Sequence, residues 1–145
     1  MKTAFLIILI SLLTLISCKK DRETNFGLYH AWKAKNFMSV ESVAYPKVEG
    51  NKILLIFDQS GSYSLNLDIN NCNGSFMSGE NNQLQILSPG CSKACCDSPF
   101  SEKLASMLPK VTSYSIEGTT LKLNVPQWGY IEFEWNGLPE INPNP

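Results

Sequence analysis

Four of the five cysteines lie close together in the middle of the chain, and a short helical pattern follows them directly. They are Cys72, Cys91, Cys95 and Cys96. In an exported protein, such a group is typical of two disulfide bonds, which stabilise a small domain mainly by restricting its unfolded chain. The sequence therefore predicts a disulfide-tied corner that holds the helix against the rest of the domain.

Residues 1–17 have the composition of a signal peptide. Lys2 is followed by about a dozen almost uninterrupted apolar residues, a run too short for a comfortable membrane span. The run ends in the letters L-I-S-C at Cys18, which resemble the lipobox of bacterial lipoproteins. The resemblance implies cleavage before Cys18 and attachment of the lipid there, so that residues 18–27 form the lipidated cysteine and a polar tether.

The expected anchor places the mature protein in the cell envelope. Two or three acyl chains hold a protein stably on a membrane, whereas one chain holds it weakly. By resemblance to lipoprotein sorting signals, Lys19 in place of an aspartate favours the outer membrane. The alternative is an ordinary signal peptide, or an uncleaved anchor, with a coincidental cysteine.

The chain of 145 residues is long enough for one small domain, and its charges balance. It has 12 Lys and Arg residues against 13 Asp and Glu residues, a formal net charge of −1. These charges are scattered singly along the sequence. We therefore expect no nucleic-acid partner.

From Trp32 onward, short apolar or alternating segments are separated by turn residues, a pattern typical of β-strands. In the clearest of these segments, Tyr63, Leu65, Leu67 and Ile69 are expected on one buried face. The expected strands are residues 28–37, 52–57, 63–69, 72–76, 83–87, 111–117, 120–125 and 130–135.

Residues 98–108 instead follow a helical period. Ser98 is a capping residue, Pro99 suits the first helical position, and Pro109 ends the helix. Because a helix this short is marginal alone, its apolar stripe must pack on the sheet. The stripe consists of Phe100, Leu104, Met107 and Leu108, and Lys103 is expected on the exposed face.

The order of these features resembles the META domain, also called HslJ-like. The resemblance lies in N-C-N-G-S-F at 71–76, A-C-C at 94–96 and Y-x-I-x-G-x-x-L-x-L at 114–123. It implies a mainly β (α+β) domain over residues 28–136, in which a curved antiparallel sheet closes toward a small barrel and packs one short helix. Members of the family are linked to stress responses without an agreed biochemical activity. Residues 137–145, rich in Pro and Asn, are expected to form an unstructured tail.

The pairing of the four cysteines remains open in part. A bond between Cys95 and Cys96 would close a strained ring, so we expect Cys72 to pair with one of them and Cys91 with the other. The C-x₃-C-C spacing does not suit zinc, and the thioredoxin-type C-x-x-C motif does not occur. We therefore expect structural disulfides and no metal site.

No group of residues indicates catalysis or a cofactor. His30 is the only histidine and is expected at the surface, and three isolated acids are expected in turns and helix capping. These acids are Asp58, Asp68 and Asp97.

The aromatic residues allow two interpretations. Trp32, Trp128, Tyr130 and Trp135 line the mouth of a ligand site or simply fill the core. Trp128, between Pro126 and Gly129, is the one most expected to be exposed.

Two function hypotheses follow. The first is a non-enzymatic envelope lipoprotein that acts as a binding or interaction module, with a role in stress tolerance and with an envelope protein or a small apolar ligand as its partner. The second is an inhibitor of an exogenous hydrolase, by analogy at the level of fold. A concave apolar pocket would favour ligand binding, and a protruding rigid loop would favour inhibition.

Overall fold

The computed structural model of the protein describes residues 27–137. The predicted signal peptide, the lipidation site Cys18 and all of the predicted tether except residue 27 lie outside the described residues. The predicted tail lies outside them as well, apart from residue 137. The predictions made for these segments therefore stay predictions.

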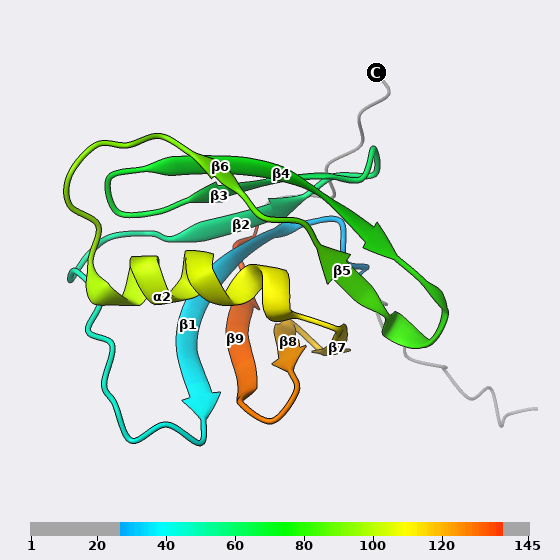
Figure 1. Ribbon diagram of the computed structural model, residues 1–145. Coiled ribbons are helices and arrows are strands. Elements are labelled where there is room, and N and C mark those ends of the chain that lie inside the picture. The colour runs from blue at the N-terminus through cyan, green and yellow to red at the C-terminus, as the bar shows by residue number, and fades with distance from the viewer. Residues whose placement is uncertain (1–26, 138–145) are drawn as a thin grey trace, which may run out of the picture.

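Nine strands form one antiparallel sheet that curves into a nearly closed barrel (Figure 1). Their order across the sheet is β5-β4-β3-β2-β1-β9-β8-β7, and β6 adds to β4. The predicted mainly β fold is thus confirmed. The strands are β1 Ala31–Ser39, β2 Leu54–Phe57, β3 Ser62–Asn66, β4 Asn71–Ser78, β5 Leu84–Ile86, β6 Gly90–Cys91, β7 Ser113–Glu117, β8 Thr120–Val125 and β9 Gly129–Trp135.

The two ends of the sheet, β5 and β7, meet at a single point. Gln83 and Ser113 form an antiparallel bridge, and the Leu84 amide donates to the Thr112 carbonyl at 3.0 Å. Because β5 has only three residues, this contact cannot continue along β7. A 3₁₀ turn, η2 (Glu80–Asn82), connects β4 to β5.

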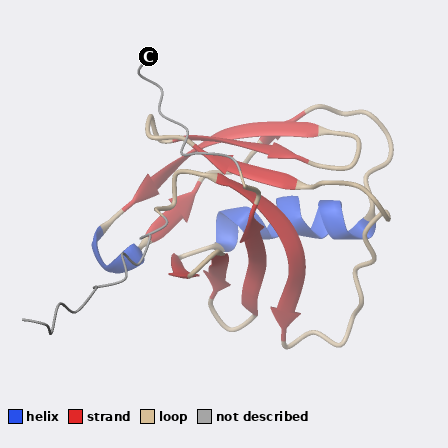
Figure 2. Ribbon diagram, turned by 180° about the vertical axis from the view of Figure 1, so that it is seen from behind, coloured by secondary structure: helices blue, strands red, loops and turns tan. Residues whose placement is uncertain are grey.

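The helix α2 (Pro99–Met107) runs between the two halves of the curved sheet, as both overall views show (Figures 1 and 2). The Ser98 side chain caps it by accepting from the Ser101 amide at 3.3 Å. A 3₁₀ turn, η3 (Leu108–Lys110), follows and contains Pro109. The predicted stripe of Phe100, Leu104, Met107 and Leu108 is buried.

The interior of the barrel is filled with large apolar side chains. Trp32, Phe57, Leu65, Leu104 and Phe133 are fully buried, and the indole nitrogen of Trp32 donates to the Leu28 carbonyl at 2.9 Å. Each such side chain contributes roughly 1.5–3 kcal/mol through burial. Trp32 therefore fills the core, in line with the second of the two interpretations of the aromatic residues.

Two predictions about β3 and its neighbourhood are wrong in detail. β3 ends at Asn66, because the Leu67 amide turns back to the Asn70 carbonyl at 2.9 Å. Ile69 is consequently 52% exposed, although the alternating pattern placed it on the buried face. Alternation continues in the sequence past the point where the chain leaves the sheet.

His30 and Trp128 are both buried, contrary to prediction. His30 is 8% exposed and packs edge-on against Trp32 and Trp135. Trp128 is also 8% exposed, because the turn before β9 folds back against the end of β1. Gly129 permits this approach: its φ is +137°, and a side chain there would collide with the Met38 carbonyl.

Candidate functional site

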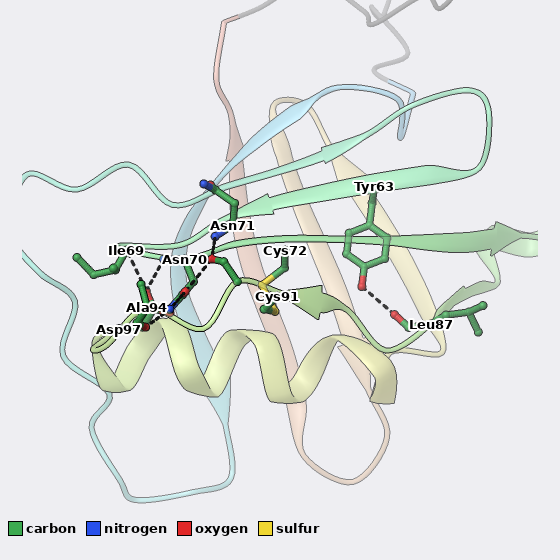
Figure 3. Close-up of a disulfide and its surroundings, with 10 residues drawn as sticks. Tyr63, Ile69, Asn70, Asn71, Cys72, Leu87, Cys91, Ala94 and Asp97 are labelled. Atoms are coloured by element: carbon green, nitrogen blue, oxygen red, sulfur yellow. Dashed lines mark hydrogen bonds between the residues drawn. A yellow bond between two sulfur atoms is a disulfide. The ribbon is translucent and has the colours of Figure 1, made fainter.

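The cysteines do not form the predicted link between the sheet and the helix. Cys72 pairs with Cys91, because β6 lies beside β4 and places the two residues opposite each other, with Cα atoms 4.0 Å apart (Figure 3). Cys95 pairs with Cys96 in an exposed segment before α2. The prediction that Cys72 joins Cys95 or Cys96 was therefore wrong.

Asn70 makes the link that the disulfide was expected to make. Its side-chain amide donates to the Ala94 carbonyl at 2.8 Å and to the Asp97 carboxylate at 2.7 Å (Figure 3). Its side-chain oxygen accepts from the Ala94 amide at 2.8 Å. Asn70 is buried, so these bonds tie the segment before the helix to the turn between β3 and β4.

Asp68 holds the start of α2. Its carboxylate accepts from the Ser98 amide at 3.0 Å, from the Ser101 hydroxyl at 2.6 Å and from the Ser98 hydroxyl. Burial opposes ionisation, but the hydrogen bonds from Ser101 and Ser98 outweigh it and lower the pKa of Asp68. Asp68 therefore has a structural role, because it holds the capping residue Ser98 in place.

The other two isolated acids also have structural partners. Asp58 accepts from the Ser60 amide at 2.8 Å, as expected of an Asx turn. Asp97 accepts from the Ile69 amide at 2.8 Å and so joins the residue before the helix cap to the turn between β3 and β4.

The family element N-C-N-G-S-F has a packing explanation. Gly74 pairs with Tyr63 across β3 and β4, and a side chain at Gly74 would collide with the Tyr63 ring. The Tyr63 hydroxyl then reaches the Leu87 carbonyl at 2.8 Å (Figure 3). Burial raises the pKa of Tyr63 to about 12, so the hydroxyl remains a donor at all ordinary pH values.

A partly enclosed surface with polar and apolar groups lies under the connection between β1 and β2. This β1–β2 loop, residues 40–53, swings out from the end of β1 and returns past the start of α2 (Figure 1). It encloses a cleft of about 290 Å³, which we term the loop cleft. Its walls include Lys35, Phe37, Glu41, Tyr45, Lys47 and Phe100.

Aromatic rings form the floor of the loop cleft. Phe37 and Phe100 stack with centroids 4.4 Å apart, and Tyr45 meets Phe37 edge-on at 5.6 Å. Trp128 contacts Phe37 from another direction at 5.7 Å. Such offset and edge-on contacts are the favourable arrangements of aromatic pairs.

An ion pair fixes the β1–β2 loop to the helix. Lys103 lies 2.9 Å from Glu41, and the Tyr45 hydroxyl donates to the same carboxylate at 2.6 Å. Hydrogen bonds from Tyr45 and then Lys103 lower the pKa of Glu41 to about 2. The Lys103 ammonium also lies 4.8 Å from the centre of the Tyr45 ring, and its side chain is only 17% exposed. The expectation that Lys103 occupies the exposed face was wrong.

Positive charge gathers at the other wall of the loop cleft. Lys47 donates to the Lys35 carbonyl at 2.7 Å and to the Ala34 carbonyl at 3.2 Å, and lies 5.1 Å from the centre of the Phe100 ring. Burial and the neighbouring Lys35 lower the pKa of Lys47. Within the described residues, Lys33 and Lys35 share a single partner carboxylate, Glu134.

A second hollow, of about 690 Å³, lies where β5 meets the segment after α2. Its lining includes Met77, Gln85, Lys110 and Thr112, and no aromatic ring borders it. It therefore offers fewer specific contacts than the loop cleft.

The predicted aromatic mouth does not form as a unit. Trp32 is in the core, Trp135 packs against His30, and Tyr130 lies below the Lys122 ammonium. Only Trp128 reaches the group of rings beside the loop cleft. Sequence reasoning missed Phe37 and Tyr45, because the chain segments that bring them to Phe100 are joined only in the folded protein.

Two further observations concern residues 27–137. Among them, no cluster of His, Cys, Asp and Glu side chains has the grouping needed to hold a metal ion. In the same part of the chain, no helix combines the length and apolar composition required to cross a membrane.

A protein-family model identifies the family of this chain. The META domain model matches residues 27–133. The chain belongs to the META domain family. No curated protein sequence matches it significantly.

Two solved structures share the fold. One is a crystal structure of a DUF4847 family protein from Bacteroides vulgatus, with a TM-score of 0.54 and 13% identity, covering 77% of this chain and 95% of the other. The other is an NMR structure of a protein from Burkholderia xenovorans, with a TM-score of 0.59 and 15% identity, covering 76% and 83%. At these identities, the similarity concerns the fold alone.

Proposed function

We propose that this META-domain protein is a non-enzymatic lipoprotein of the cell envelope that binds a partner molecule through the loop cleft. The observation that supports this proposal most directly is the loop cleft itself. The stacked Phe37 and Phe100 rings form its floor, and charged side chains lie at its rim. An apolar floor with a few placed polar groups is the usual chemistry of a binding site. The role in stress tolerance that the family resemblance implies would depend on that partner.

The position of the loop cleft supports this proposal. β1 has nine residues and spans roughly 30 Å. The predicted tether joins the domain before β1, whereas the β1–β2 loop leaves from its far end at Ser39. A domain anchored through Cys18 would therefore carry its binding surface at the end of β1 away from the membrane attachment.

The carboxylate at the cleft favours binding over catalysis. A general base works best when its pKa lies near the operating pH. Glu41, with a pKa of about 2, stays ionised and bound to Lys103 and Tyr45. Its contacts hold the loop, which is a structural role.

A photo-crosslinking amino acid at Val43 tests the proposal. Val43 lines the cleft and is 62% exposed, so the substitution leaves the core intact. In cells that produce the full chain, we expect a light-dependent adduct with a defined partner. Thr119, exposed in the turn between β7 and β8, is the matched control position and should give no such adduct. Equal adducts at both positions, or none at Val43, would contradict the proposal.

The exposed side of the same loop supports a second candidate function, inhibition of an exogenous hydrolase. Val40, Val43 and Val48 are exposed along the loop, and the contacts of Glu41 and Tyr45 hold it in place. A held loop with exposed apolar residues can enter the cleft of an enzyme. Stoichiometric inhibition of a panel of secreted glycoside hydrolases and proteases, abolished by Val43→Asp, would support this candidate, and a lack of inhibition across the panel would count against it.

A further inference from the structure

The second half of β1 has a free edge facing the loop cleft. β1 pairs with β9 along nearly its whole length, but with β2 only from Ala31 to Lys33. The reason is that β2 begins at Leu54, and the chain before it departs into the β1–β2 loop. Beyond a register shift at Lys35, one side of β1 therefore has no neighbouring strand among the described residues.

The direction of the backbone groups on this edge follows from one hydrogen bond. The Val40 amide donates to the Trp128 carbonyl, on the β9 side, at 2.9 Å. Because backbone groups alternate between the two sides of an antiparallel strand, those of Phe37 and Ser39 point away from β9. Both residues line the loop cleft, and no hydrogen bond found within residues 27–137 joins their backbone to the loop.

Phe37 and Ser39 are two positions apart, and their backbone donors and acceptors point to the same side of β1. Such groups on the edge of a sheet can pair with an added strand. An extended segment of about three residues is sufficient to pair with Phe37 and Ser39. Alternate side chains of such a segment point to opposite faces. One of them would rest on the stacked rings of Phe37 and Phe100.

The charges at this edge indicate which peptide fits. Lys33, Lys35 and Lys47 lie together near two carboxylates: Glu134 pairs with the first two lysines, and Glu132 lies near Lys35. Glu41, on the opposite wall, is already neutralised by Lys103. The edge of β1 therefore has an excess of positive charge that an acidic side chain would balance.

We propose that the loop cleft binds an extended acidic peptide segment of a partner protein, which adds as a short strand to the free edge of β1 at Phe37 and Ser39. This inference rests on the proposed binding function and names the class of its partner. The backbone pairing provides affinity, the aromatic floor takes an apolar side chain, and the lysines select for an acidic one.

Panning of a phage-displayed random heptapeptide library against the full chain tests the inference. We expect enriched peptides in which Asp or Glu lies near an apolar residue. A synthetic copy of the strongest peptide is then methylated on single backbone nitrogens. Methylation of a nitrogen that faces β1 should weaken binding roughly three- to tenfold, whereas methylation of the adjacent nitrogen should have a much smaller effect.

Substitutions in the protein test whether the lysines select for an acidic peptide. Lys35→Gln should weaken binding of the same peptide roughly two- to fivefold and reduce its salt dependence. Lys122→Gln is the matched control, because Lys122 is another strand lysine paired with a glutamate, at 2.8 Å from Glu117. This control should leave binding unchanged.

The possible results distinguish a failure of this inference from a failure of the proposed function. No enriched peptide, neutral or basic enriched peptides, or equal tolerance of methylation at every nitrogen would overturn the strand-addition inference. If Val43 nevertheless gives a specific crosslinked adduct, the binding function stands with a different class of partner. If Val43 gives no adduct either, both proposals fail.

Discussion

The pairing of Cys72 with Cys91 leads to a quantitative prediction about stability. The bond joins residues separated by 19 positions. Chain-entropy arithmetic for a loop of this length gives a stabilisation of about 3 kcal/mol at 25 °C. Cys91→Ser removes the bond at an exposed position, so the variant should lose about this amount and its midpoint of thermal unfolding should fall by roughly 10–20 °C.

Two further variants separate the bond from its surroundings. The Cys72 side chain is fully buried, so Cys72→Ser removes the same bond and also buries a hydroxyl, at an additional cost of about 1–3 kcal/mol. A double substitution of Cys95 and Cys96 by Ser removes a bond between neighbours, which closes only a ring of two adjacent residues. By the same entropy argument, this variant should lose little stability.

Urea unfolding of the four proteins under oxidising conditions, followed by tryptophan fluorescence, provides the free energies of unfolding. The free energy of unfolding should decrease in the order wild type, the Cys95 and Cys96 double variant, Cys91→Ser, Cys72→Ser. A loss below about 1 kcal/mol for Cys91→Ser, or a larger loss for the double variant, would refute the pairing.

Cys18→Ala should abolish labelling of the protein by a clickable fatty acid, and retained labelling would exclude lipidation at that residue. Leu104→Ala should cost about 2–5 kcal/mol of unfolding free energy as a truncation in the core, measured by urea unfolding. Lys103→Ala should cost about 1 kcal/mol in the same assay, because its ammonium lies over aromatic rings, and a cost near zero would show that the contact does not stabilise the loop. Glu41 has a folded-state pKa of about 2, below its ordinary value of 4.5, so its contribution to stability is present above pH 4.5 and is lost as the pH falls toward 2. The fluorescence of Trp128 should report this transition, which Glu41→Gln should remove.

The sequence predicted the limits of those strands and helices that are set by the residues at their own ends. The strand over residues 120–125 was predicted with its observed bounds, because its alternating residues remain in the sheet from end to end. The helix was predicted within one residue at each end, because Ser98, Pro99 and Pro109 mark its limits chemically.

Features that depend on long-range pairing were missed. β6 has two residues, too few to leave a periodic signal, yet it places Cys91 opposite Cys72 and so decides the disulfide. The loop cleft combines the end of β1, a loop without periodicity and the first turn of the helix. The sequence predicts an exposed Lys103, because the helical period indicates which residues form the apolar stripe. It does not show that a distant loop will cover Lys103.

The central claim, that the partner binds at the loop cleft, is tested most directly by amide hydrogen exchange followed by NMR on the full chain. With the partner captured through Val43 added in excess, we expect new protection at the amides of Phe37 and Ser39. In the free protein these amides should exchange readily, because no hydrogen-bond acceptor for them is found within residues 27–137. The amides of the hollow between β5 and the segment after α2, such as Gln85 and Lys110, should be unchanged and provide the internal control. Protection at Gln85 and Lys110 without protection at Phe37 and Ser39 would contradict the account.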